Sequence, residues 1–454
     1  MRYDVIIIGA GPGGFETAKI LGKAGKKVAL VEKDQVGGIC LNRGCIPAKT
    51  MLYSAEMFRI GKKIKNYGIR FCQDVPGFDF DAMIKHRAEI MNSLRENWVD
   101  QIENVGVDMI YGWAELTGDN TVEVDGKEYE ADYIVLATGG DARKFPGFID
   151  EDERFLVSDN IFELKSFPES IFILGAGPVG TEFATFFSTF GVKTHILDLG
   201  PTFLSYFDHD LGNELIKSFK EDGVSCYTEV GLESVDASGE LLKLKLTDGT
   251  EIEVEKMLSA IGMVPNMEYI KNENIKFNER GRFEVNKSLQ TTVSNIYAIG
   301  DANGLSGSAY GAEREGLYVA HHILGDPLYD IPLDYAAFPD VIFTDPEVAT
   351  CGLSEQECNQ KGIDFVAVCV PFSKNGKAAI KGETKGFCKI IAERGSEKVL
   401  GVHIIGSSAT ELIHAAVIPV RDEVRVGVWL RKVWGHPVLS EIIKDALSEL
   451  DGLL

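Results

Sequence analysis

The sequence predicts an α/β protein with two similar βαβ units and a separate α+β module after them. The βαβ units are indicated by two short runs of branched apolar residues, each followed at once by a glycine-rich turn and separated by 166 residues. The α+β module is indicated by strand patterns at 366–370, 386–392 and 399–405, with helical patterns at 409–417 and after residue 440. A chain of 454 residues is long enough for two to four domains of about 100–200 residues each.

The composition is that of a globular protein with a large negative charge. Hydrophobic residues make up 45%, charged residues 25%, and the formal net charge is −23. These values argue against disorder and against nucleic-acid binding, since phosphate contacts need clustered Lys and Arg. No apolar run approaches the roughly 18–20 residues that span a bilayer, and no signal-peptide core opens the chain. We therefore expect a cytoplasmic protein without a membrane segment.

The first glycine turn follows the apolar run 5–8 and contains Gly9, Gly11 and Gly14, with Glu32 at the end of the next predicted strand. The first glycine permits a sharp turn, the second lets backbone approach a pyrophosphate, and the third lets helix and strand pack closely. Free backbone N–H groups at the start of the helix then face the phosphates. The distal acid is placed to accept hydrogen bonds from ribose hydroxyls.

The second turn repeats this pattern after the run 171–174, with Gly175, Gly177, Gly180 and the acid Asp198. A single motif of this kind is a weak signal, and two ordinary glycine turns are the alternative. Two copies with an acid at the same spacing predict that the chain binds two dinucleotides in Rossmann-like domains. No Arg follows Asp198 closely to hold a 2′-phosphate, which favours NAD over NADP.

Two cysteines, Cys40 and Cys45, lie close together between the first turn and a predicted helix, while the other six are scattered. The C-x4-C spacing is not that of common zinc sites, and no second Cys or His pair follows nearby, so no metal site is predicted. A disulfide across five helical residues needs a break in the helix, which Gly44 can supply. The residues alone leave two buried structural cysteines as the alternative.

The cysteine segment resembles the redox-disulfide motif of the FAD-dependent pyridine nucleotide–disulfide oxidoreductases. The resemblance extends from residue 4 to about residue 447 and is strongest to those members that oxidise dihydrolipoamide with NAD+. It includes the segments Ala137–Gly140, Gly175–Glu182, Ala260–Gly262, Ala298–Asp301, Thr344–Val348 and His436–Glu441. It implies FAD and NAD as cofactors, a homodimer, and dihydrolipoamide, carried on a multienzyme complex, as the substrate.

The resemblance implies that the first turn with Glu32 holds FAD and that Asp301 accepts hydrogen bonds from the ribityl chain. From its position alone, Asp301 could instead cap the next helix. Two further stretches are implied to run beside the flavin, and two residues to line the nicotinamide dinucleotide. The stretches beside the flavin are Thr138, Gly139 and Gly140, and Gly307, Ser308, Ala309 and Tyr310. The residues that line the nicotinamide dinucleotide are Val230 and Gly262.

The same resemblance assigns the reactive groups. Lys49 is implied to lie beside the flavin and to pair with Glu182, which by position alone is an acid in the first turn of a helix. Cys45 is implied to contact the flavin and Cys40 to exchange with substrate. Because thiol exchange needs a base, His436 is implied in that role, supplied by the partner subunit. It would be oriented by Glu441. A lone His before Pro is otherwise more often a surface or structural residue.

Four positions depart from the family pattern. Arg43 replaces a small apolar residue between the cysteines and could lower a thiol pKa or favour an anionic substrate. Met263-Val264 replaces an Arg pair, Trp434 replaces a His, and Tyr310-Gly311 replaces His-Lys. These changes leave the cysteine relay intact but bear on the substrate.

The expected division of the chain follows the resemblance. The FAD-binding domain is formed by 1–145 and 268–335, the NAD-binding domain by 146–267, and the dimerisation domain by 336–454. Two other functions are kept as alternatives: an NAD(P)H-dependent reductase of another disulfide or acceptor, and a non-catalytic flavoprotein subunit. A mercuric-type reductase is disfavoured because 450–454 lacks cysteines, and a glutathione-type reductase because NADP arginines are missing.

Overall fold

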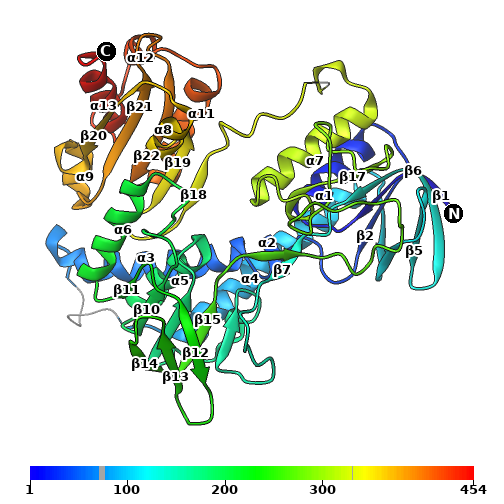
Figure 1. Ribbon diagram of the computed structural model, residues 1–454, viewed down its shortest axis with the longest axis horizontal. Coiled ribbons are helices and arrows are strands. Elements are labelled where there is room, and N and C mark those ends of the chain that lie inside the picture. The colour runs from blue at the N-terminus through cyan, green and yellow to red at the C-terminus, as the bar shows by residue number, and fades with distance from the viewer. Residues whose placement is uncertain (71–76, 330) are drawn as a thin grey trace.

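The computed structural model describes residues 1–70, 77–329 and 331–454. Figure 1 shows three α/β or α+β bodies, one for each of the main sheets, with a long connection leading from α7 to the last of them. Cys72, one of the six scattered cysteines, lies outside the described residues. In the described ranges, no helix is both long enough and apolar enough to cross a membrane.

The first sheet has the strand order β3-β2-β1-β6-β5-β4, with β17 paired to β6. Its central strands β2, β1, β6 and β17 are parallel, as predicted for a Rossmann-like unit. Helix α1 follows the first glycine turn and packs against α7. The elements are β1 Arg2–Ile8, α1 Pro12–Lys23, β2 Val28–Glu32, α2 Gly38–Asn42, α3 Cys45–Lys63, α4 Phe80–Glu103, β3 Asp108–Tyr111, β4 Ala114–Leu116, β5 Thr121–Val124, β6 Lys127–Leu136, β17 Ile296–Ala298 and α7 Ala309–Leu324.

The second sheet has the order β11-β10-β9-β15-β8 and consists of parallel strands. An antiparallel β12-β13-β14 sheet lies beside it. The chain passes between the first and second bodies twice, and the two connecting segments pair as the short antiparallel strands β7 and β16. The elements are β7 Gly140–Ala142, β8 Phe155–Val157, β9 Ser170–Leu174, α5 Pro178–Thr189, β10 Lys193–Leu197, α6 His209–Glu221, β11 Ser225–Tyr227, β12 Leu232–Asp236, β13 Leu242–Leu246, β14 Glu251–Val254, β15 Lys256–Ser259 and β16 Met263–Pro265.

The C-terminal body is an antiparallel sheet, β18-β19-β22-β21-β20, with helices packed on it. The three predicted strands are confirmed as β20, β21 and β22. The predicted helix 409–417 is wrong as one element, because it is interrupted at Ile413 and two short helices result. The elements are β18 Asp340–Ile342, β19 Val348–Gly352, α8 Glu355–Lys361, β20 Phe365–Pro371, α9 Gly376–Lys381, β21 Phe387–Glu393, β22 Val399–Ile405, α10 Ala409–Leu412, α11 His414–Arg421, α12 Val426–Leu430 and α13 Glu441–Asp451.

The sheet memberships are compatible with the expected domain boundaries, which we retain as a proposal. Strand β17 returns to the first sheet after the whole second sheet has been formed, so the second body is an insertion in the first. This arrangement brings the carboxyl ends of two parallel sheets to the same region of the molecule, with α3 packed between them against α5.

Candidate active site

The two glycine turns have the same backbone geometry. Gly9 and Gly175 have φ of +102° and +101°, a region that residues with a Cβ rarely occupy. A Cβ on Gly14 would lie 1.9 Å from the carbonyl oxygen of Gly9, and the corresponding distance at Gly180 is also 1.9 Å. These four glycines are therefore required by the fold, because no side chain fits where helix and strand meet.

The middle glycine of each turn is free of such constraints. Gly177 has φ of −77°, and a Cβ placed there meets no atom within 4 Å. At Gly11 the nearest atom, the Gly38 Cα, would be 3.8 Å away. A glycine that the protein itself does not need leaves open space at a helix N-terminus, as binding of a pyrophosphate requires. Both turns thus fit dinucleotides.

The two distal acids are held by equivalent hydrogen bonds. Glu32 accepts from the backbone N–H of Ala10 at 2.9 Å and of Asp34 at 2.9 Å. Asp198 accepts from the corresponding N–H groups, those of Ala176 and Gly200, each at 2.8 Å. A carboxylate has about four acceptor sites, so each acid is fixed in place and can still accept from a ribose.

The remaining predicted dinucleotide residues gather at the carboxyl ends of the parallel strands, where ligands bind in open α/β sheets. Thr138 and Gly139 follow β6, and Asp301 follows β17, on the first sheet. Val230 and Gly262 follow β11 and β15 on the second. Gly307 and Ser308 precede α7, Ala309 and Tyr310 begin it, and Gly140 begins β7.

A returning segment that the sequence did not identify fixes the Thr138 stretch. The hydroxyl groups of Thr138 and the buried Tyr269 are 2.7 Å apart, and the Asn266 backbone N–H donates to Gly139 O at 3.3 Å. A Cβ on Gly140 would lie 2.6 Å from Val264 O. Met263-Val264, one of the departures, thus forms part of the ladder that closes over the stretch.

Asp301 lies in a short 3₁₀ turn, Gly300–Ala302, and does not cap the next helix, whose N-cap is Ser308. The alternative reading of Asp301 is therefore wrong. The turn is held by Glu315, a fully buried residue that sequence reasoning missed. Its carboxylate accepts from the Gly300 N–H at 2.7 Å, from Asn303 Nδ2 at 2.8 Å and from the Tyr335 hydroxyl at 2.8 Å. The sequence signal that could have identified Glu315 is an acidic residue among the apolar positions of α7.

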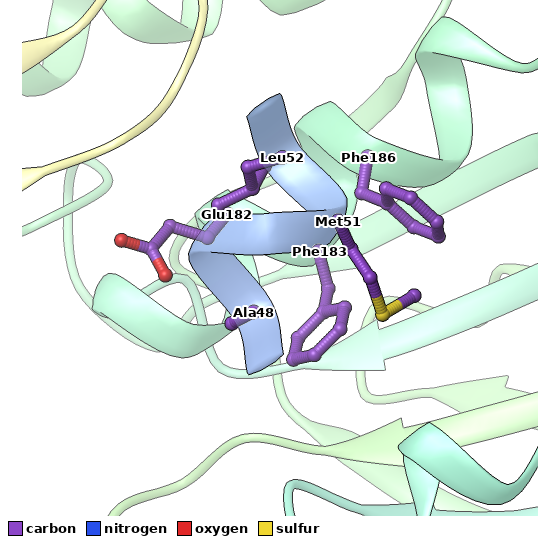
Figure 2. Close-up of a pocket in the computed structure, with 6 residues that line it drawn as sticks. All are labelled: Ala48, Met51, Leu52, Glu182, Phe183 and Phe186. Atoms are coloured by element: carbon purple, nitrogen blue, oxygen red, sulfur yellow. The ribbon is translucent and has the colours of Figure 1, made fainter. Parts of the chain in front are cut away.

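Lys49 and Glu182 form the predicted ion pair. Lys49 Nζ lies 2.8 and 2.7 Å from the two carboxylate oxygens of Glu182, which also accept from the Phe343 N–H at 3.1 Å. Figure 2 shows the packing of α3 on α5 that sets this geometry, with the Glu182 carboxylate turned away from Met51 and Phe183. Glu182 is the fifth residue of α5, so its reading as a first-turn acid is wrong.

The cysteine pair lies at a break between two helices. Cys40 is inside α2, Cys45 begins α3, and Gly44 between them is non-helical, with φ −143° and ψ −108°. The predicted relaxation of the helix at Gly44 is confirmed. Both cysteines are free thiols, half-buried, and their side chains hydrogen bond to each other.

The two thiols differ strongly in acidity. The hydrogen bond from Cys40 and the charge of Lys49 lower the pKa of Cys45 to about 7, against the raising effect of burial. The same hydrogen bond, together with burial, raises the pKa of Cys40. Arg43 contributes instead to the environment of Asp159, whose pKa burial raises and Arg43 lowers. Cys45 is therefore the more acidic thiol of the pair.

His436 and Glu441 are in contact, as the resemblance implied. The His436 Nδ1 atom lies 3.0 and 3.1 Å from the two carboxylate oxygens, and the Val438 N–H also donates to Glu441. The hydrogen bond from His436 lowers the pKa of Glu441. The His436 side chain is 79% exposed, and α13, which begins at Glu441, is clearly apart from α2 in Figure 1. One chain does not bring His436 to its own cysteines.

The comparisons with known proteins agree with this geometry. The family model of the pyridine nucleotide-disulphide oxidoreductases matches residues 3–316, and that of the dimerisation domain of the same family matches residues 338–447. Among curated proteins, the chain is similar to the dihydrolipoyl dehydrogenases of Chlamydia muridarum (33% identical, covering 99% of the chain and 97% of the relative) and Bacillus subtilis (32%, 99% and 98%).

Two solved structures resemble the chain over nearly its whole length. One is LpdA from Mycobacterium tuberculosis, with a TM-score of 0.90 and 25% identity, covering 99% of each chain. The other is the HOCl-induced flavoprotein disulfide reductase RclA from Escherichia coli, with 0.87 and 27%, covering 98% of this chain and 99% of the other. FAD and NAD are the cofactors of the family, and both glycine turns have room for them. The chain is an oxidoreductase that belongs to the pyridine nucleotide–disulphide oxidoreductase family.

Proposed function

We propose that the protein is an NAD-dependent dihydrolipoamide dehydrogenase that works as a cytoplasmic homodimer. The observation that carries the proposal is the pair of unequal thiols at Cys40 and Cys45, placed beside the Lys49–Glu182 pair between two dinucleotide turns. The similarity to curated dihydrolipoyl dehydrogenases over nearly the full length supports this substrate. A non-catalytic subunit would have no use for this arrangement.

The thiol chemistry assigns a role to each residue. A substrate thiolate attacks the Cys40 sulfur of the Cys40–Cys45 disulfide, so that the S–S bond breaks and Cys45 leaves as a thiolate. The second substrate thiolate then attacks the substrate sulfur of the mixed disulfide, which releases oxidised substrate and Cys40. A pKa of about 7 makes Cys45 the better leaving group, and the charge of Lys49 stabilises the thiolate.

The two protons lost by the dithiol need an acceptor outside the buried pair. We assign this role to His436 of the partner subunit, with Glu441 fixing its ring through Nδ1 and leaving Nε2 for the substrate. Its exposure on one chain fits a residue that completes a site on another. When bound, FAD carries the electron pair between the dithiol and the nicotinamide of NAD.

The assignment is tested by steady-state oxidation of dihydrolipoamide with NAD+ or NADP+ by the FAD-loaded dimer. We expect turnover with NAD+, loss of turnover in Cys40→Ser and Cys45→Ser, and no change in Cys369→Ser, an exposed thiol distant from the motif in sequence. Activity that survives in Cys45→Ser would contradict the proposed thiol relay. Turnover of NADH with another disulfide, but none with dihydrolipoamide, would contradict the substrate.

That last result would support the second candidate, a reductase of another disulfide. It is favoured by the similarity to RclA and by the departures at Arg43 and Trp434. Trp434 packs against the C-terminal core near Trp429, with ring centroids 6.4 Å apart. A ring of this size close to His436 changes the shape of the approach to the disulfide.

A further inference from the structure

The departure at Tyr310 leads to a cluster of three polar residues from three parts of the chain. The Tyr310 hydroxyl, in the first turn of α7, donates to Asp340 Oδ1 at 2.9 Å. Asp340 begins β18 in the C-terminal body. Tyr206, from the loop after Asp198, lines with Asp340 a cavity of about 240 Å³. Each body therefore contributes one polar side chain to the same place.

This place borders the second dinucleotide turn on one side. The loop that carries Tyr206 folds back over the turn, because the Leu204 N–H donates to Ala176 O at 3.0 Å. Ala176 lies between the first and second glycines of the turn, and its own N–H donates to Asp198. Tyr206, two residues beyond Leu204, is 60% exposed and lines the cavity.

On the other side the cluster borders the Lys49–Glu182 pair. The Phe343 N–H, three residues after Asp340, donates to Glu182 at 3.1 Å, and Lys49 Nζ lies 5.1 Å from the centre of the Phe343 ring. The segment from Asp340 to Phe343 thus runs from the cluster to the ion pair. The cluster is thus connected to the turn assigned to NAD through the Tyr206 loop and to the Lys49–Glu182 pair through the Asp340–Phe343 segment.

The cluster has the chemistry to bind that ribose. Within the described part of the chain, Tyr310 is the one group that donates to the Asp340 carboxylate, which has about four acceptor sites in all. Burial raises the pKa of Asp340, and the Tyr310 bond offsets part of this effect. A carboxylate that can accept from two neighbouring hydroxyls is the usual protein partner of a ribose diol.

We propose that Asp340, held by Tyr310 and flanked by Tyr206, is a cofactor-binding residue that holds the ribose on the nicotinamide side of NAD. The proposal rests on the assignment of the Gly175 turn to NAD. In this family pattern the position of Tyr310 usually carries His, so the hydroxyl–carboxylate pair is a feature of this chain.

The test is the dissociation constant of three ligands on the FAD-loaded dimer, measured by calorimetry with no substrate turning over. NAD+ has both the nicotinamide and the second ribose that carries it. ADP-ribose has the second ribose without the nicotinamide, and ADP lacks both. We expect Asp340→Asn to weaken NAD+ and ADP-ribose by about tenfold each, or about 1.4 kcal/mol, and to leave ADP within about twofold. Tyr310→Phe should have the same pattern with a smaller effect. Asp334→Asn, an exposed acid in the same connection, should change none.

Each other outcome overturns the proposal. Equal weakening of all three ligands would make the Tyr310–Asp340 bond a tether that only positions the domains. Weakening of NAD+ alone would assign Asp340 to the nicotinamide ring, and no change would remove it from the site. The NAD assignment is tested separately by Asp198→Ala, which should weaken all three ligands. If the wild-type dimer binds none of them, that assignment fails whatever Asp340 does.

Discussion

The acidity of Cys45 should move in opposite directions when the two members of the neighbouring ion pair are removed. The positive charge of Lys49 lowers the pKa of Cys45 and the negative charge of Glu182 raises it. Lys49→Met removes the first effect and leaves Glu182 unpaired, so the Cys45 pKa should rise from about 7 by roughly one unit, or about 1.4 kcal/mol. Glu182→Gln should lower it. Cys40→Ala should raise it most, because its hydrogen bond is the largest cause.

The measurement is the rate of alkylation of Cys45 in the anaerobically reduced, FAD-loaded enzyme between about pH 5 and 9, followed by peptide mass spectrometry. Lowering the pKa from 9.0 to about 7 stabilises the thiolate by about 2.7 kcal/mol, so about half of Cys45 should react as thiolate at pH 7. Burial raises the pKa of Cys351 and Cys358 to about 12 and 11, so they serve as internal controls. A Cys45 that titrates near 9, or shifts of one sign in both variants, would refute the reasoning.

Three further predictions concern the turns and the dimer. Gly177→Ala should leave thermal unfolding unchanged and weaken NAD+ binding at least tenfold by titration. Gly180→Ala, whose Cβ would lie 1.9 Å from a carbonyl oxygen, should instead lower the unfolding temperature. An unchanged NAD+ affinity in Gly177→Ala would contradict the assignment of this turn to the pyrophosphate. Cys45→Ser and His436→Gln chains, each inactive alone, should regain about a quarter of wild-type activity when they are unfolded and reassembled together. Half of the dimers are then mixed, and each mixed dimer has one complete site of its two. No recovery would contradict the role of the partner's His436. NADP+ should bind at least tenfold more weakly than NAD+ because the Asp198 carboxylate repels a 2′-phosphate, and equal affinities would contradict this.

The parts of the site that lie in local motifs could be predicted from the sequence. The turns rest on the positive φ of Gly9 and Gly175 and on the close contacts of Gly14 with Gly9 and of Gly180 with Gly175, which are five residues apart, so the glycine spacing specifies them. The pairing of His436 with Glu441 is likewise local, since the two residues are five apart. In these cases the residue types and their spacing contain the geometry.

The supporting contacts could not be predicted, because each joins residues that are far apart in the chain. The bond from Tyr269 to Thr138 spans 131 residues and that from Phe343 to Glu182 spans 161. The first depends on how the chain returns from the second body to the first, and the second on how the C-terminal body packs against the second. Glu315 showed only as an acid among apolar helix positions, and its three donors come together through tertiary structure.

The break at Ile413 shows a different limit. The run 409–417 has good helical periodicity, but the chain forms two short helices on either side of Ile413, and both pack against β19 and β22. Periodicity alone does not show a one-residue interruption of this kind. No residue of the candidate site depends on it.

The central claim is that a dithiol passes its electrons to NAD+ through Cys40 and Cys45. The most direct test mixes the oxidised, FAD-loaded dimer with one equivalent of dihydrolipoamide per site and then adds NAD+. Absorbance records the contact between the Cys45 thiolate and the flavin, and then the NADH formed. We predict one NADH per site, preceded by a long-wavelength band that is absent in Cys45→Ser. Reduction by NADH together with no reduction by dihydrolipoamide would contradict the account.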